Sequence, residues 1–478
     1  MSISNEDITE LAVSALKTMH AENGDGFKFP ADLIWSYTEQ SDKIPSTARP
    51  HQPARLVRLG WLEKTGAMTK AASQARAGSP TSQYRFGPRL IGRKDSGEPR
   101  ETKRDESIAK LLVGLQVKLD SEGYIIAPAE LANFFLALRV SPLVILSGIS
   151  GTGKSLLPRK FAKSLGAAFK LVPVQPQWAD SSDIFGYVPT LAPSEFKAGV
   201  LIPSIIKARN NPDELIIVVL DEMNLAPVEH YLSDFLSVAE TRERVDGQVI
   251  TDHLPIELPN PDTDGSDKYQ DLRNITLPPN LRVIGTANMD ETTHLFSPKV
   301  LDRAFTIEFD DPDLTAFPEY GASEEQTFQR ISDAIISQSE AINIQEAAGV
   351  SSELFAEIAF LLQQVQDILA PAGVKFGYRT RDAILLYLHY WHKFGLHDVI
   401  AANAAVDFCL LQKVLPKIAG TGDVLLEALR NLSEWLSAER TGDEIAGSRS
   451  GPFMRSHEKT KRMIHLLELD GATSFWGV

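Results

Sequence analysis

Short apolar runs in the middle of the chain predict the strands of a buried parallel sheet. One run covers 144–146, a second covers 215–220 and a third, mostly apolar, covers 281–287. Continuous apolar runs of this length are expected for strands that are covered on both faces, and each run is followed by polar residues. A fourth segment, 305–309, mixes apolar and polar residues. The pattern therefore predicts an α/β fold for this part of the chain.

The first hundred residues have a different pattern. The predicted elements are, in order, a helix at 8–19, an apolar patch at 33–35, a helix at 53–59, a small basic arm at 67–82 and an aromatic strand at 83–86. Helices followed by a flexible arm and a returning strand are the order of a winged helix. We therefore expect a small α+β winged-helix-like domain over 1–95. The polar, charged segment 96–106 lacks apolar periodicity and is expected to be a linker.

The first central strand leads into a candidate phosphate loop. The segment from Gly148 to Ser155 fits the pattern G-x-x-x-x-G-K-[ST]. Glycines let backbone N–H groups close around phosphate oxygens, a lysine supplies positive charge to the β- and γ-phosphates, and a serine hydroxyl can ligate Mg²⁺. The residues predicted to bind nucleotide are Gly148, Gly151, Thr152, Gly153, Lys154 and Ser155.

Polar residues at the ends of the other strands supply candidate chemistry. Asp221 and Glu222 follow the second strand, which is the Walker B arrangement. Asp221 would hold Mg²⁺ together with Ser155, and Glu222 would polarise the attacking water. Asn288 ends the third strand, and its amide can hydrogen-bond the γ-phosphate or that water. Arg303 precedes the fourth strand, where ring-shaped motors place an arginine that reaches the nucleotide of a neighbour. In isolation each residue could equally cap a turn or lie on the surface, so the prediction rests on their order behind the phosphate loop.

The order of these elements resembles the AAA+ ring NTPases, with a P-loop core and a helical lid. Several segments are similar to the McrB-like branch, which drives modification-dependent restriction systems. The similar segments are 221–226, 228–231, 234–236, 285–288, 296–304, 376–379 and 414–420. The resemblance covers about residues 107–478 and leaves the first hundred unexplained.

This resemblance implies an AAA+ α/β nucleotide-binding domain over 107–315 and a helical lid with C-terminal helices over 316–478. It implies a ring, expected to be a hexamer, with Mg²⁺ as cofactor and ATP or GTP as substrate. Arg379 corresponds to the sensor arginine over the nucleotide, with Arg381 as the alternative, and 183–201 corresponds to an insertion at the central pore. It also implies a separate McrC-like nuclease subunit, because the chain contains no convincing nuclease motif.

One departure from the McrB pattern leaves the base undecided. McrB-type GTPases have Asn-Thr-Ala-Asp at the end of the sensor strand, whereas this chain has Asn-Met-Asp-Glu at 288–291. The guanine-reading Asn-Lys-x-Asp motif is absent. ATP and GTP both stay open, with a slight preference for ATP as the usual AAA+ substrate.

Charge is distributed unevenly along the 478 residues. The whole chain has a formal charge of −15, yet residues 1–104 hold 16 basic and 12 acidic residues. Within 45–94 there are ten basic residues and one acidic residue, Glu63. This asymmetry suggests a module that faces an anion, expected to be DNA, attached to an acidic motor. The alternative is an adaptor that binds protein and has a solvated basic surface.

Composition narrows the setting. The single cysteine, Cys409, excludes an intramolecular disulfide and a multi-cysteine zinc site, which fits a reducing cytoplasm. No run of about 18 apolar residues occurs, so no membrane span is expected.

Three functions are compatible with these observations. The leading hypothesis is the DNA-translocating or remodelling motor of a McrBC-like restriction or antiphage system. A MoxR-like chaperone that remodels protein complexes would share the motor without needing a basic N-terminal domain. A nucleotide-gated DNA-binding regulator would not hydrolyse, and the complete set of Walker B and arginine positions argues against it.

Overall fold

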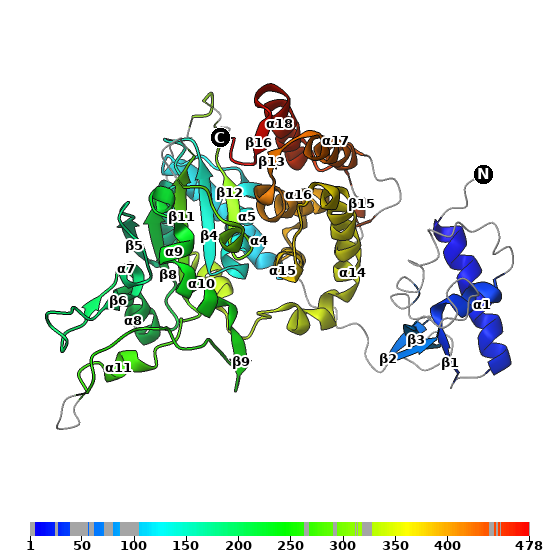
Figure 1. The fold of residues 1–478 in the computed structure, drawn as a ribbon, viewed down its shortest axis with the longest axis horizontal. Coiled ribbons are helices and arrows are strands. Elements are labelled where there is room, and N and C mark those ends of the chain that lie inside the picture. Colours follow the sequence, from blue (N-terminus) through cyan, green and yellow to red (C-terminus); the bar gives the residue numbers. More distant parts are fainter. Residues whose placement is uncertain are drawn as a thin grey trace. The chain divides into compact units, whose positions relative to one another are not determined.

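The computed structural model describes most of the chain. The described residues are 5–23, 27–38, 56, 62–70, 80–86, 105–261, 267–289, 294–310, 312, 314–317, 327–438, 444–445, 448–449 and 451–477. The chain divides into two compact units, 1–101 and 102–478, which are described separately (Figure 1).

The first unit combines helices with a small antiparallel sheet. Its elements are α1 (Asn5–Asn23), β1 (Lys28–Pro30), η1 (Ala31–Ser36), β2 (Leu62–Lys70) and β3 (Pro80–Phe86), and the strand order is β1-β3-β2. The buried side chains of α1 are Ala12, Ala15, Leu16 and Met19, which recur at helical spacing on one face. They form a core with Phe29, Ile34, Trp35, Leu56, Leu62 and Phe86.

The segment predicted as a basic arm is partly strand. Strand β2 extends to Lys70, which pairs with Pro80 of β3, and the register shifts between Lys64 and Met68. The segment forms strand because it pairs with a neighbouring strand. The pattern of small and polar residues within the segment does not predict this pairing. The rest of the arm, 71–79, and the predicted helix at 53–59 apart from Leu56 lie outside the described residues.

The second unit is built on a five-stranded parallel sheet, which confirms the predicted α/β fold. Its strands are β4 (Leu143–Gly148), β5 (Ala168–Pro173), β8 (Ile216–Asp221), β11 (Leu281–Asn288) and β12 (Phe305–Glu308), in the order β12-β4-β11-β8-β5. Four of these are the predicted strands. The fifth, β5, lies at one edge and exposes about half of its residues, so its sequence lacks the continuous apolar run of the others.

Helices cover both faces of this sheet because the crossovers change direction. The chain first runs from β4 out to β5 and then back to β8 and β11. Right-handed crossovers in opposite directions place their helices on opposite faces, as for α6 (Leu156–Leu165) and α8 (Ile202–Asn210). The other helices are α4 (Glu106–Ser121), α5 (Pro128–Val140), α7 (Ser182–Phe185), α9 (Val228–Tyr231), α10 (Ser233–Glu240), α11 (Gln270–Arg273) and α12 (Pro298–Leu301). Two short hairpins are β6–β7 (Gly186–Tyr187, Lys197–Ala198) and β9–β10 (Glu243–Val245, Gln248–Ile250).

The C-terminal region is helical, as the resemblance implied. It contains α13 (Gln329–Ile336), α14 (Ile344–Leu369), α15 (Tyr378–Lys393), α16 (Ala402–Lys413), α17 (Asp423–Ser437) and α18 (Met454–Asp470), with strands β13 (Ala419–Thr421) and β16 (Ala472–Ser474) paired antiparallel (Figure 1). The side chains of Tyr387, Tyr390 and Trp391 in α15 are buried, whereas Tyr378 at its start is exposed, and the Tyr387 hydroxyl donates to Asn133 Oδ1 of α5 at 2.8 Å. These contacts join the helical region to the sheet domain. Within the described part of the chain, no helix is both long and apolar enough to cross a membrane.

Gly285 tests how tightly the central strand is packed. A Cβ added at this position would overlap the sulfur of Met223, which fills the space above β11. We expect Gly285→Ala to lower the free energy of unfolding by about 1–3 kcal/mol, the usual cost of overpacking a dense core. Urea unfolding measures the change. The control is Gly377→Ala, since Gly377 has open space around it and a φ of −102°. Equal stability of the two variants would contradict the packing argument.

Candidate nucleotide-binding site

The predicted site residues other than Arg303 and Arg379 meet at the carboxyl edge of the sheet. Strand β11 lies between β4 and β8, pairing Asn288 with Gly148 on one side and Gly285 with Leu220 on the other. Because all three strands are parallel, the phosphate loop, the Asp221-Glu222 pair and Asn288 end at the same edge. Segments up to 140 residues apart in sequence are thereby brought into one site.

Glycine is required at two points of the phosphate loop. Gly148, Gly151 and Gly153 all have positive φ, at 139°, 86° and 88°. A Cβ on Gly148 would lie 2.5 Å from the carbonyl oxygen of Phe309, and one on Gly153 would lie 3.0 Å from the Tyr124 ring. Any other residue would therefore push the loop away from these neighbours.

The loop lysine is held within its own loop. Lys154 Nζ donates to the carbonyl oxygens of Gly148 at 2.9 Å and Ile149 at 2.6 Å. Burial lowers the pKa of Lys154, while the charges of Asp310, Asp221 and Glu222 act in the opposite direction. The Thr152 hydroxyl also donates to the Ile149 carbonyl, at 3.0 Å. A phosphate at the loop would take over donors that the backbone carbonyls hold in this structure.

Ser155 and Asp221 fit a magnesium site. The Ser155 hydroxyl donates to Asp221 Oδ1 at 2.6 Å, so a hydroxyl and a carboxylate already lie side by side. Mg²⁺ prefers such oxygen ligands and takes few of them from protein, since phosphates and water complete its shell. The described residues contain no cluster of three or more His, Cys, Asp or Glu side chains that could hold a metal. The donor set thus suits a shared protein–nucleotide metal site better than an all-protein cage.

Glu222 has a strained backbone and two local restraints. Its φ and ψ are 51° and 49°, a left-handed conformation that costs a non-glycine residue about 1–3 kcal/mol. Its N–H donates to the Thr286 hydroxyl at 2.9 Å, and its Oε1 accepts from Asn288 Nδ2 at 3.1 Å. The predicted pair of Glu222 and Asn288 is therefore in direct contact.

Two positioning residues were not predicted as site residues. Thr286 donates to Asp221 Oδ1 at 2.7 Å while it accepts from the Glu222 N–H, so one hydroxyl holds both Walker B residues. Asn224 is fully buried and donates to the carbonyl oxygen of Asn288 at 2.8 Å. The available signal was a hydroxyl within a buried strand and an amide just behind two carboxylates.

Arg303 lies at the opposite, amino edge of the sheet. Its carbonyl accepts from the Ser141 hydroxyl at 3.0 Å, just before β4 begins. A strand of six residues, at about 3.3 Å per residue, separates this edge from the phosphate loop by roughly 17 Å. Its guanidinium donates to Glu240, from Nε at 2.7 Å and from a terminal nitrogen at 2.9 Å. Arg303 therefore does not reach a phosphate held by its own chain.

Arg379 lies beside Arg303 and not over the phosphate loop of its own chain, where the sensor position of the family led us to expect it. One terminal nitrogen is 2.8 Å from Glu240 Oε2. Helix α15 brings it there because Lys417 Nζ donates both to Thr380 and to Asp302. The alternative, Arg381, is on the same side, with its guanidinium over the Tyr378 ring at 4.6 Å.

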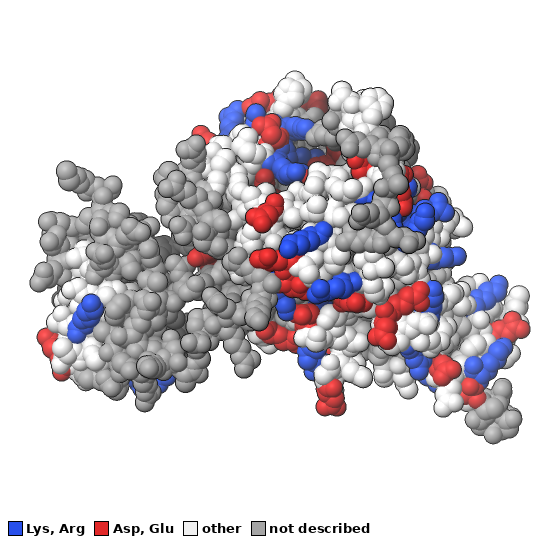
Figure 2. All heavy atoms as spheres, turned by 180° about the vertical axis from the view of Figure 1, so that it is seen from behind, with Lys and Arg blue, Asp and Glu red and all other residues white. Residues whose placement is uncertain are grey.

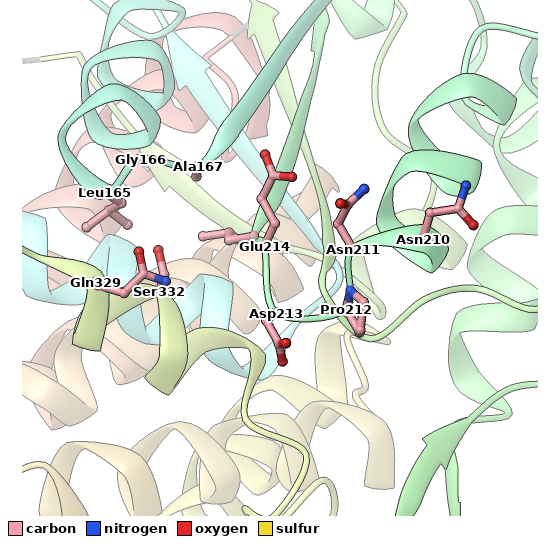
Figure 3. A pocket seen from close by; sticks show the side chains of 11 residues that line it. Leu165, Gly166, Ala167, Asn210, Asn211, Pro212, Asp213, Glu214, Gln329 and Ser332 are labelled. Carbon is pink, nitrogen blue, oxygen red and sulfur yellow. The ribbon is translucent and has the colours of Figure 1, made fainter.

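Two cavities lie at the amino edge. One of about 680 Å³ is lined by Glu240, Arg303, Arg379 and Arg381, among others. Another of about 460 Å³ lies between the end of α6, the segment before β8 and α13 (Figure 3). Asp213 and Glu214 line this second cavity, which shares no residue with the phosphate loop. Its acidic lining does not suit a triphosphate.

The comparisons with known families agree with this geometry. A family model described as an AAA domain of the dynein-related subfamily matches residues 143–305. This chain carries an AAA+ domain. The matched range begins with β4 and ends at the start of β12, so it contains the phosphate loop, the Walker B pair, Asn288 and Arg303. A second model, for a domain of unknown function, matches 328–473, the helical C-terminal region.

Similarity to individual proteins is low. One solved structure, the full-length MCM homologue of Methanopyrus kandleri, aligns with 66% of this chain at 14% identity and a TM-score of 0.35. The alignment spans 62% of that homologue's length, which is less than two thirds. No curated protein matches the chain.

Thr286 provides a test of the site geometry. The substitution Thr286→Val removes the hydroxyl that contacts both Asp221 and Glu222. The loss of these hydrogen bonds is expected to cost about 1–2 kcal/mol of interaction free energy. We expect the kcat of nucleotide hydrolysis to fall about tenfold, with nucleotide affinity changed less, because the phosphate loop is untouched. Thr286→Ser keeps the hydroxyl and should retain most activity. Steady-state phosphate release measures both variants, and equal activity of the two would contradict the positioning role.

Proposed function

We propose that this chain is a ring-forming nucleoside triphosphatase that hydrolyses ATP or GTP. The observation that carries the proposal is the contact set at the carboxyl edge of the sheet. There Ser155 of the phosphate loop donates to Asp221, Asn288 donates to Glu222, and the Thr286 hydroxyl contacts both Asp221 and Glu222. A bound Mg²⁺ would be held by Ser155 and Asp221 and would neutralise charge on the phosphates.

The residues of the site divide the work of hydrolysis. Lys154 is placed to exchange its loop carbonyls for phosphate oxygens. Glu222 is the general base that orients and polarises the attacking water, and it lies directly after the end of β8 with a left-handed backbone conformation. Asn288 holds that carboxylate and offers an amide to the γ-phosphate or the water. Arg303 lies too far away and would act on the nucleotide of a second copy, which is why we propose a ring, expected to be a hexamer.

The finer assignment is a McrB-like motor of a restriction or antiphage system in the cytoplasm, with a separate McrC-like nuclease. It is supported by the contacts among the segments that resemble this branch. Asn224 donates to the Asn288 carbonyl, and Lys417 donates to Asp302. Residues that carry the resemblance thus support each other in space.

We further propose that the first unit, which covers the winged-helix-like domain predicted at 1–95, binds DNA. Ten of the eleven charged residues of 45–94 are basic. On the face of the second unit seen in Figure 2, basic and acidic side chains are interspersed. The concentration of positive charge in the first unit favours it as the contact for a phosphate backbone.

Two substitutions test the hydrolytic site. Lys154→Ala should abolish nucleotide binding, because it removes the charge that faces the phosphates. Glu222→Gln should preserve binding and lower kcat by about 100-fold or more, the usual contribution of a general base. Phosphate release with ATP and GTP side by side, together with fluorescent-nucleotide binding, measures both variants. The same assays on the wild type show whether the substrate carries adenine or guanine. Hydrolysis by Glu222→Gln at the normal rate would contradict the role of Glu222.

A salt titration tests the DNA proposal on the full chain. Binding should weaken linearly in log affinity against log salt, and the double change Lys64→Glu and Lys70→Glu on β2 should reduce that slope by about 2. Fluorescence anisotropy with duplex DNA measures the slope. The control is Lys461→Glu, an exposed residue of α18 in the second unit. Absence of binding at low salt would overturn the proposal and favour the MoxR-like chaperone.

A further inference from the structure

Two arginines converge on one carboxylate at the amino edge of the sheet. Glu240, the last residue of α10, accepts from Arg303 through both oxygens, at 2.7 and 2.9 Å. Its Oε2 also lies 2.8 Å from a terminal nitrogen of Arg379. The side chains of Arg303 and Glu240 are 19% and 26% exposed, and that of Arg379 is 60% exposed. The group is therefore open to an incoming ligand on the Arg379 side.

Hydrogen bonds from two lysines connect the segments that carry the two arginines. Lys417 Nζ donates to Asp302 and to Thr380, which are the chain neighbours of Arg303 and Arg379. Lys413 Nζ is buried and donates to the carbonyl oxygens on either side of Arg303, those of Asp302 at 3.0 Å and Ala304 at 2.6 Å. The segments from which the two arginine side chains extend are thus held in place relative to each other before any ligand binds.

The pair is matched to an anion with more charge than a carboxylate. Two guanidiniums share one carboxylate, so one positive charge is left over on this group. Arg381 lines the same cavity of about 680 Å³, where its charge is paired with that of Asp382, and the third acid of the lining, Asp302, is paired with Lys417. A terminal phosphoryl group presents similar oxygens with greater charge, and arginine forks bind it strongly. The phosphate loop of the same chain is roughly 17 Å away across β4. The phosphate that fits here therefore belongs to nucleotide held by a second copy.

We propose that Glu240 is an internal substitute for that phosphate. It holds Arg303 and Arg379 together in the separate chain and releases both to the triphosphate of the adjoining copy. The inference rests on the proposed function and adds two points to it. Arg379 acts with Arg303 on the neighbour's nucleotide, and Glu240 is a positioning residue whose ion pairs oppose assembly until a triphosphate replaces them.

Glu240→Gln in the full chain tests the competition. The amide keeps the size of the side chain and removes its charge, so the arginines are released more easily. With the imido analogue of whichever triphosphate the wild type hydrolyses, half-maximal assembly should require about five- to tenfold less protein, the change expected from one weakened charge-assisted contact. Sedimentation velocity measures it. The matched control is Glu243→Gln, whose exposed side chain has no partner among the described residues, and it should leave assembly unchanged.

A double-mutant cycle separates this effect from a general change of charge. In a chain that also carries Arg303→Ala and Arg379→Ala, Glu240→Gln should no longer alter assembly. Persistence of the gain in that background, or assembly of Glu240→Gln at the wild-type concentration or above, would overturn the inference. If the wild type assembles and hydrolyses while the variant shows no gain, the proposed function stands and this inference fails. A wild type that does neither overturns both.

Discussion

Strand β11 lies between β4 and β8, and its parallel pairing with both decides which residues of this chain can meet. The pairing places Asn288 level with Gly148 and carries Thr286 to Asp221 and Glu222. A slip of one residue would turn Thr286 to the other face of the sheet and separate the Walker B carboxylates from their shared hydroxyl. Gly285 makes this register possible, since Met223 occupies the space where its side chain would be.

In the proposed ring, the two edges of the same sheet act on different nucleotide molecules. The carboxyl edge holds the phosphate loop, and the amino edge holds Arg303, Arg379 and Glu240. A strand of six residues keeps these groups about 17 Å apart, so Arg303 does not reach the phosphate loop of its own chain. The proposal of a second copy therefore rests on strand length and direction, and the Glu240 ion pairs would hold the two arginines in the separate chain.

Buried polar contacts join the helical region to the sheet, so 102–478 forms one compact unit although two family models divide it. Arg282 of β11 donates to the Ile335 carbonyl of α13 at 2.8 Å, and Arg139 of α5 donates to the Tyr390 hydroxyl of α15 at 2.7 Å. Burial lowers the pKa of Lys413 to about 7, yet its ammonium finds three carbonyl acceptors in the turn around Arg303. A shift of α16 would move that turn, which couples the helical region to the arginine pair.

Local sequence pattern was enough to predict the phosphate loop, the Asp221–Glu222 pair, Asn288 and four of the five strands, because each is encoded within a few consecutive residues. A buried strand shows as an apolar run, and a loop that wraps phosphate needs glycines at fixed spacing. The edge strand β5, the contacts of Thr286 and the meeting of Arg379 with Arg303 at Glu240 could be seen only in the folded chain. These depend on pairings between segments 48 or more residues apart. Local pattern records whether a side chain is buried, whereas strand order and direction decide what it is buried against.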